Sequence, residues 1–115
     1  MKDERLPLVH IYECLRTIES YTKSGREKFL EDRLIQDAVY RNFTIIGEAS
    51  KRLSEQIRSK APHIQWRRIA GFRDVLIHQY EGVDPIEVWL IIENDDSKLI
   101  NDIRNLLLEL GCPIE

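Results

Sequence analysis

Apolar residues recur along this chain at intervals of three and four, and this spacing limits the possible folds more than any other feature. The first stripe, Leu8, Ile11, Leu15 and Ile18, marks a helix at about residues 6–22. The sequence has no sustained alternation of apolar and polar residues and no Asn-Gly or Asp-Gly hairpin turn. Intervals of three and four place side chains on one face of an α-helix, whereas a half-buried strand needs an interval of two. The sequence therefore predicts an all-α fold.

A second, longer helix is predicted from about residue 31 to residue 59, and Ala61-Pro62 ends it because a residue before proline is pushed out of the helical region. Its core stripe contains one polar residue, Asn42. The other positions of the stripe are Ile35, Val39, Ile46, Ala49, Leu53 and Ile57. A lone asparagine on such a stripe can fix the register of packed helices. We expect this structural role for Asn42 rather than a catalytic one.

A third helix is predicted at about residues 65–81, and Gly82 stops it. Its core-facing positions are Ile69, Phe72 and Leu76, which leaves the arginines of this segment nearer the rim. His78 lies so close to the helix end that its turn can loosen into a 3₁₀ turn or irregular coil.

The last helix is predicted from about residue 85 towards residue 110 and begins at Asp84-Pro85-Ile86-Glu87, which supplies a cap, a first-turn proline and a capping-box glutamate. The stretch least favourable to this helix is Asn94-Asp95-Asp96-Ser97. The helix can divide there, with Asp96 as the N-cap of the second half. A chain of 115 residues can bury one core. The sequence thus predicts an up-and-down bundle of four to five helices in a single domain, residues 1–115.

Charges are unevenly distributed along the chain, although the net charge is only -3. Residues 51–73 carry seven bases and one acid, whereas residues 74–115 carry ten acids and two bases. Such asymmetry fits a localised anion-binding patch on an acidic body. The candidates for the patch are Lys51, Arg52, Arg67 and Arg68. The alternative is that these charges lie on the solvated faces of two helices and never converge.

The predictions of cellular compartment and of cofactors depend mainly on sequence patterns that are absent. No apolar run approaches the roughly 18 residues of a membrane span, and residues 1–5 lack the apolar stretch of a secretory signal, so we expect a cytoplasmic protein without membrane contact. Cys14 and Cys112 show no metal-binding or redox spacing and are interpreted as free thiols. His10 and His63 lack ligand spacing, and no metal ion or cofactor is predicted.

Arg73, His78 and Tyr80 form the pattern Arg-x4-His-x-Tyr and are the strongest functional candidates. An imidazole exchanges protons near neutral pH, and a guanidinium grips phosphate through two parallel hydrogen bonds, so the pair suits chemistry on a phosphodiester. On a helix, Arg73 and Tyr80 lie about 20 degrees apart, but His78 lies about 140 degrees from Arg73. Asp74 precedes His78 by four residues and can hold its ring. Alternatively, a second copy of the chain completes the site.

The Arg-x4-His pattern resembles the signature of HEPN domains, and with the tyrosine it resembles the HepT toxins of HepT/MntA toxin-antitoxin modules. Four further segments resemble the pattern of that family: Ile46-Gly47-Glu48-Ala49, Pro62-x-Ile64-x-Trp66, Gly71-Phe72-Arg73-Asp74, and Val83-Asp84 followed by Val88-Trp89. Two positions depart from it, since Asp74 stands where asparagine is frequent and Ser97 where proline is common.

The resemblance implies a homodimeric HEPN domain that is the toxin of a type VII toxin-antitoxin system. It implies a metal-independent endoribonuclease acting on tRNA or mRNA, with Arg73 on the phosphate and His78 as acid or base, and cleavage that leaves a 2′,3′-cyclic phosphate. It also implies that a cognate MntA-type minimal nucleotidyltransferase, the antitoxin, blocks the toxin by transferring AMP to Tyr80. RNA then becomes the expected ligand of the basic patch.

Two other readings of the same residues are weighed against this one. In the first, the chain is a non-catalytic helical subunit that binds a nucleotidyltransferase, and Arg73 and His78 hold nucleotide phosphate without cleaving RNA. In the second, Asp74 forms a buried salt link with Arg73 or His78 at a helix end of a purely structural dimer.

Overall fold

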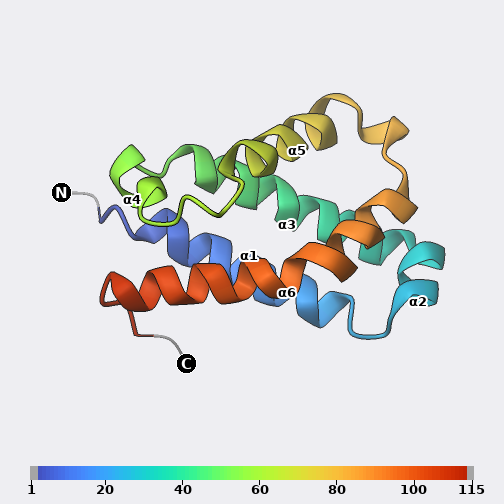
Figure 1. Cartoon of the computed structure of the whole chain (residues 1–115). Coiled ribbons are helices and arrows are strands. Elements are labelled where there is room, and N and C mark those ends of the chain that lie inside the picture. Colours follow the sequence, from blue (N-terminus) through green and yellow to red (C-terminus); the bar gives the residue numbers. More distant parts are fainter. Residues whose placement is uncertain (1–2, 114–115) are drawn as a thin grey trace.

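The computed structural model describes residues 3–113, and all regular structure in that range is helical, which confirms the predicted fold class. Figure 1 shows the arrangement, with α3 between α1 and α5 and with α6 beside α1. The elements in chain order are α1 (Leu6–Tyr21), α2 (Arg26–Glu31), α3 (Arg33–Lys51), α4 (Glu55–Ser59), α5 (Trp66–His78), the 3₁₀ turn η1 (Tyr80–Gly82) and α6 (Pro85–Glu109).

Helix α1 confirms the first predicted stripe. Leu8, Ile11, Leu15 and Ile18 are all fully buried, and α1 packs on α3 and α6. Pro7 in the first turn favours the helix start because its fixed φ is helical and its missing N–H has no partner to lose there. Together with buried residues of α3 and α6, this stripe forms one continuous core.

The prediction of one helix over residues 31–59 is wrong in its extent, because this segment contains two helix breaks. Asp32 is extended, and its carboxylate accepts hydrogen bonds from the first-turn N–H groups of Leu34 and Ile35, so α3 begins at a cap rather than continuing α2. Ser54 caps α4 in the same way through Ile57. The apolar spacing continues across the second break because Leu53 and Ile57 remain buried, and spacing alone therefore hides it.

Helix α2 was not predicted. It is short, and it starts after Gly25, whose φ of 94° lies in the left-handed region that glycine adopts without strain. Phe29 is its one buried residue and packs against Trp89 of α6, with ring centroids 5.6 Å apart. The buried Gln36 amide donates to the carbonyl oxygens of Phe29 and Leu30 and so holds the end of α2 on α3.

Two polar residues have other roles than those predicted. The Asn42 amide donates to the carbonyl of Ala38, one turn earlier in the same helix, so it does not fix the register between helices. Asp96 does not cap a second half of the last helix, because α6 runs without interruption and buries this side chain. The predicted start of α6 is confirmed, since the Asp84 carboxylate accepts from the N–H of Ile86.

Helix α5 is placed by α3 alone among the long helices, whereas α6 makes its main contacts with α1 and α2. The helix ends at His78, three residues before its predicted end, and the chain then forms a 3₁₀ turn at Tyr80–Gly82, one of the two conformations that the sequence allowed there. Cys14 and Cys112 are free thiols, also as predicted. No helix in the described part of the chain combines the length and the hydropathy that crossing a membrane requires.

Candidate functional site

Gly47 of α3 allows α5 to approach closely at Arg73. A Cβ atom on Gly47 would lie 2.1 Å from Cβ and 2.7 Å from Cγ of Arg73, which no pair of carbon atoms tolerates without backbone movement. The glycine in Ile46-Gly47-Glu48-Ala49 is therefore explained by packing, because any other residue would push the two helices apart. This packing fixes the aliphatic part of the Arg73 side chain, independently of the contacts that its guanidinium makes.

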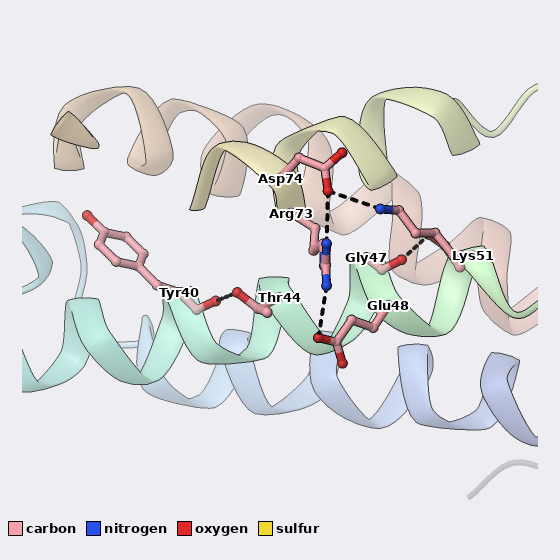
Figure 2. Close-up of polar contacts among 8 residues, drawn as sticks. Tyr40, Thr44, Gly47, Glu48, Lys51, Arg73 and Asp74 are labelled. Atoms are coloured by element: carbon pink, nitrogen blue, oxygen red, sulfur yellow. Dashed lines mark hydrogen bonds and ion pairs between the residues drawn. The ribbon is translucent and has the colours of Figure 1, made fainter. Parts of the chain in front are cut away.

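The guanidinium of Arg73 lies between two carboxylates at the α3–α5 boundary (Figure 2). Its Nη1 donates to Oδ1 of Asp74 at 3.0 Å, and its Nη2 donates to Oε1 of Glu48 at 3.4 Å. Lys51 Nζ donates to the same Asp74 oxygen, also at 3.0 Å. The hydrogen bonds from Lys51 and then Arg73 hold the pKa of Asp74 below its ordinary value. Two cations and two carboxylates thus alternate along this boundary.

Asp74 was expected to hold His78, and the structure places it elsewhere. Its carboxylate turns towards α3, where Lys51 and Arg73 supply two cationic donors. No hydrogen bond joins Asp74 and His78 in residues 3–113. The helical spacing of four residues brings the two positions to one face, but the stronger partners across the helix boundary decide where the side chain points.

His78 ends α5 and is exposed, without a hydrogen bond to any described residue. Gly71, Val75 and His78 follow at intervals of four and three, and all three are exposed, so they share the outer face of α5. A Cβ atom on Gly71 would meet nothing within 4 Å. Arg73 faces α3 while His78 faces solvent, as the predicted angle between them indicates. One copy of the chain therefore does not bring the two side chains together.

Tyr80 lies on the α3 side of the chain, the same side as Arg73. Its hydroxyl donates to the carboxylate of Asp37, and its ring meets the edge of the Tyr40 ring at 6.1 Å between centroids. Arg33 pairs with Asp37 at 3.3 Å and holds its guanidinium carbon 6.0 Å from the Tyr80 ring centroid. Asp37, as acceptor, raises the pKa of the Tyr80 phenol. The side chain is 40% exposed and so remains accessible.

The four basic candidates do not form one patch. Lys51 belongs to the Arg73 cluster through Asp74. Arg52 and Arg67 are exposed, and Arg68 donates to the side chain of Gln65 at 2.8 Å, on the part of α5 that faces α6. Lys51 thus lies beside Arg73, and Arg68 lies apart from that cluster.

Glu48, Asp37 and Arg33 were missed as site residues. The signal that could have found Glu48 and Asp37 is a second, polar stripe on α3, in which Asp37, Thr44, Glu48 and Lys51 recur at helical intervals beside the apolar one. That stripe faces α5 and η1. No group of three or more His, Cys, Asp or Glu side chains in the described part of the chain is arranged to hold a metal ion.

Comparison with known proteins places the chain in a family. Residues 11–106 match the family model described as Ribonuclease HepT-like. A protein named "Gamma-glutamylcyclotransferase and putative RNase" from Methanocaldococcus jannaschii is 42% identical over 110 residues, which cover 95% of this chain and 50% of that protein. The chain thus spans half the length of this relative.

Two further relatives are covered almost completely. A "Putative RNase" from the same organism is 39% identical over 111 residues, which cover 90% of this chain and 92% of the relative. A "Probable ribonuclease HepT" from Thermococcus cleftensis is 42% identical over 100 residues, which cover 86% of this chain and 91% of the relative. No solved structure was found to match. From the family model and these identities, the chain belongs to the Ribonuclease HepT-like family.

Proposed function

We propose that this chain is a metal-independent endoribonuclease that acts as a homodimer of single HEPN domains, residues 1–115. The observation that carries the proposal is a guanidinium fixed at the α3–α5 boundary and followed, five residues later, by an exposed imidazole, in a family of ribonucleases. The names of the covered relatives support the same activity.

The reaction uses a nucleophile that belongs to the RNA. His78 removes the proton from a ribose 2′-hydroxyl, whose oxygen attacks the neighbouring phosphorus while the bond to the 5′-oxygen breaks. The leaving 5′-oxygen takes up a proton from a general acid, so the products are a 2′,3′-cyclic phosphate and a 5′-hydroxyl. Arg73 stabilises the negative charge that builds up on the phosphate oxygens. The contact at 3.4 Å to the exposed Glu48 is the one that a phosphate can displace.

A second copy of the chain is proposed to complete the site, because one copy does not bring Arg73 and His78 together. The outer face of α5, defined by Gly71, Val75 and His78, has an exposed apolar residue and open space at the glycine, so two α5 helices can approach closely there. A two-fold arrangement of this face would place two histidines at one cleft. The exposed bases Arg52, Arg67 and Arg68 are proposed to contact tRNA or mRNA outside the cleft.

Regulation is proposed to act at Tyr80, in a type VII toxin-antitoxin system in the cytoplasm. An MntA-type minimal nucleotidyltransferase would transfer AMP to the exposed phenol oxygen, with release of pyrophosphate. The added phosphate would break the hydrogen bond to Asp37 and place negative charge on the side of the chain where Arg73 lies. Tyr80 is accessible in the free chain, which supports this proposal.

The alternative of a purely structural dimer, in which Asp74 forms a salt link with Arg73, is favoured by one observation. Arg73 is already held by two carboxylates, as in a structural ion-pair network. That alternative predicts intact RNA and an effect of His78→Ala on stability alone, so a cleavage assay separates the two proposals.

The deciding experiment is incubation of the purified chain with total cellular RNA in excess EDTA, after mass measurement has shown that Tyr80 is unmodified. His78→Ala is the test variant, and His10→Ala, which removes a histidine from α1, is the matched control. We expect the parent and the control to give fragments with cyclic-phosphate ends and His78→Ala to give none. Intact RNA with the parent, or equal cleavage by His78→Ala, would contradict the proposal.

A further inference from the structure

A pocket of about 360 Å³ lies between α5 and α6, and residues of α3 also line it. None of Arg73, His78 and Tyr80 lines it, so it is separate from the proposed catalytic site. Its wall is largely apolar and is formed by Phe43, Ile46, Ile64, Ile69, Phe72, Ile91 and Leu99. The rings of Phe43 and Phe72 pack edge to face, with centroids 5.2 Å apart. Such a wall fits the hydrocarbon part of a small molecule.

Asp96 lines this pocket from the middle of α6. Its side chain is only 7% exposed, yet it makes no hydrogen bond and no ion pair with any residue in the range 3–113. Buried carboxylates in proteins are normally paired with a cation or held by hydrogen bonds, because an isolated buried charge is costly. An unpaired carboxylate in an apolar pocket therefore indicates a ligand that brings a positive charge.

The other charged groups around the pocket leave Asp96 without a partner. Asp95 and Asp102 come from α6 itself, and Asp102 faces Nε2 of His63 at 3.5 Å. Arg68 of α5 is bound to Gln65, while Lys98 of α6 is exposed. Glu19 of α1 adds a further negative charge nearby. Burial, followed by the charges of Asp95 and Glu19, raises the pKa of Asp96 to about 7.

We propose that this pocket binds a small organic cation, a primary ammonium or guanidinium ion on a short alkyl body, with Asp96 as its counter-ion. The alkyl body would lie against Phe43, Phe72 and Leu99, and the charged end would reach the Asp96 carboxylate. A neutral apolar ligand would leave the carboxylate unsatisfied, and an anion would meet three carboxylates in the lining. The same chemistry is carried by a lysine or arginine side chain of a second copy, and the experiment distinguishes that source.

The test is an NMR titration of the whole chain, labelled with ¹⁵N, with pentylammonium chloride, and 1-pentanol serves as the uncharged probe. At pH 8 we expect saturable shifts at Phe72, Asp96 and Leu99 with the ammonium ion and much weaker binding of pentanol. Asp96→Asn should weaken ammonium binding at least about tenfold, because the neutral amide offers no counter-charge. The matched control Glu109→Gln, at the exposed end of α6 and outside the pocket lining, should change it by less than about threefold.

A pH series gives a second readout that needs no variant. Since the pKa of Asp96 is raised to about 7, ionised Asp96 is about tenfold scarcer at pH 6 than at pH 8, and ammonium affinity should fall by about that factor. Equal binding of pentanol and pentylammonium, no saturable binding, or unchanged affinity in Asp96→Asn would overturn the proposal. So would loss of self-association in Asp96→Asn without ligand, which would assign the cation to a second copy.

Discussion

Helix α5 separates two polar regions in which the pKa of a carboxylate is shifted in opposite directions. On the α3 side, Asp74 and Glu48 share the guanidinium of Arg73 near the surface, and the pKa of Asp74 is lowered. On the α6 side, Asp96 is buried without a partner, and its pKa is raised to about 7. The chain thus keeps its charges ionised where phosphate chemistry is proposed and holds a proton-sensitive group on the opposite side of the same helix.

The two regions also differ in how tightly the helices meet. Gly47 brings α3 and α5 into direct contact at Arg73, whereas α5 and α6 leave a pocket between them. Close contact fixes a side chain for catalysis, and open packing leaves room for a ligand. This comparison explains why one region suits a fixed catalytic group and the other suits exchangeable binding.

The largest effect is expected from Arg73→Ala, which tests the α3 side. Loss of the guanidinium should lower the rate of RNA cleavage by about 10²–10³-fold, the usual cost of removing one donor that stabilises developing charge. The measurement is the cleavage rate at saturating RNA, with circular dichroism as a check on folding. Arg104→Ala removes an exposed arginine from α6 and should leave the rate unchanged. Equal losses of cleavage rate in both variants would show that the effect comes from the overall charge of the protein and not from the position of Arg73.

Asp96→Asn tests the α6 side through stability. The folded pKa of about 7 lies above the ordinary value of 3.8, so the stabilisation by the protonated form is present below pH 3.8 and is lost as pH rises to about 7. Integrated over that window, the loss amounts to at most about 4 kcal/mol. The amide cannot ionise, so Asp96→Asn should unfold at a higher urea concentration than the parent at pH 8.

The same comparison at pH 4 is the internal control, since both side chains are then largely neutral in the folded chain. The midpoints of the two proteins should nearly coincide there. Glu109→Gln, at the exposed end of α6, should show no such pH-dependent difference. A stability gain of equal size at pH 4 and pH 8 would show that the pKa of Asp96 is not raised.

Gly47→Ala tests the close contact. The added Cβ atom meets Arg73 at 2.1 Å, and the resulting overpacking should lower the free energy of unfolding by about 1–3 kcal/mol. Gly71→Ala is the matched control, because its Cβ atom meets nothing within 4 Å and alanine favours the helix by about 1 kcal/mol. In chemical unfolding at a protein concentration low enough to keep the chain monomeric, the two variants should thus change stability in opposite directions. A destabilised Gly71→Ala would indicate that this face is packed.

Asp37→Asn should have the smallest effect, a change in the pKa of Tyr80. The Asp37 carboxylate, which accepts the hydrogen bond of the Tyr80 hydroxyl, raises the pKa of the phenol, so its removal should lower that pKa towards the ordinary value. The measurement is a pH series of the ¹³Cζ signals of the tyrosines. The signal of Tyr21, which is exposed and ends α1, serves as the internal control for sample conditions. An unchanged Tyr80 titration would show that the hydrogen bond to Asp37 does not form in solution.

Local signals in the sequence were sufficient for the fold class, the core stripe of α1, the cap at Asp84 and the opposite directions of Arg73 and His78. Each depends on residues within one or two turns of each other. The break between α3 and α4 was missed because Leu53 and Ile57 keep the apolar spacing on both sides of it. Helix α2 was missed because six residues are too few to show a period.

The contacts across helices could not be predicted from spacing. Asp74 had two neighbours available, His78 on its own helix and Lys51 on α3, and only the fold determines that Lys51 is the partner. The same holds for Asp37 and Tyr80, which are 43 positions apart. The burial of Asp96 was likewise missed, since an acidic stretch within a helix is usually a solvated face.

The alternation of Lys51, Asp74, Arg73 and Glu48 has a consequence for how RNA would arrive. Two bases and two acids cancel, so beyond a few ångströms this cluster attracts a polyanion only weakly. In the proposed ribonuclease, long-range attraction would therefore depend on the exposed arginines, Arg52, Arg67 and Arg68, and added salt would mainly slow association. Once a phosphate has displaced Glu48, the contact with Arg73 is short and partly shielded from water, and it should be much less sensitive to ionic strength.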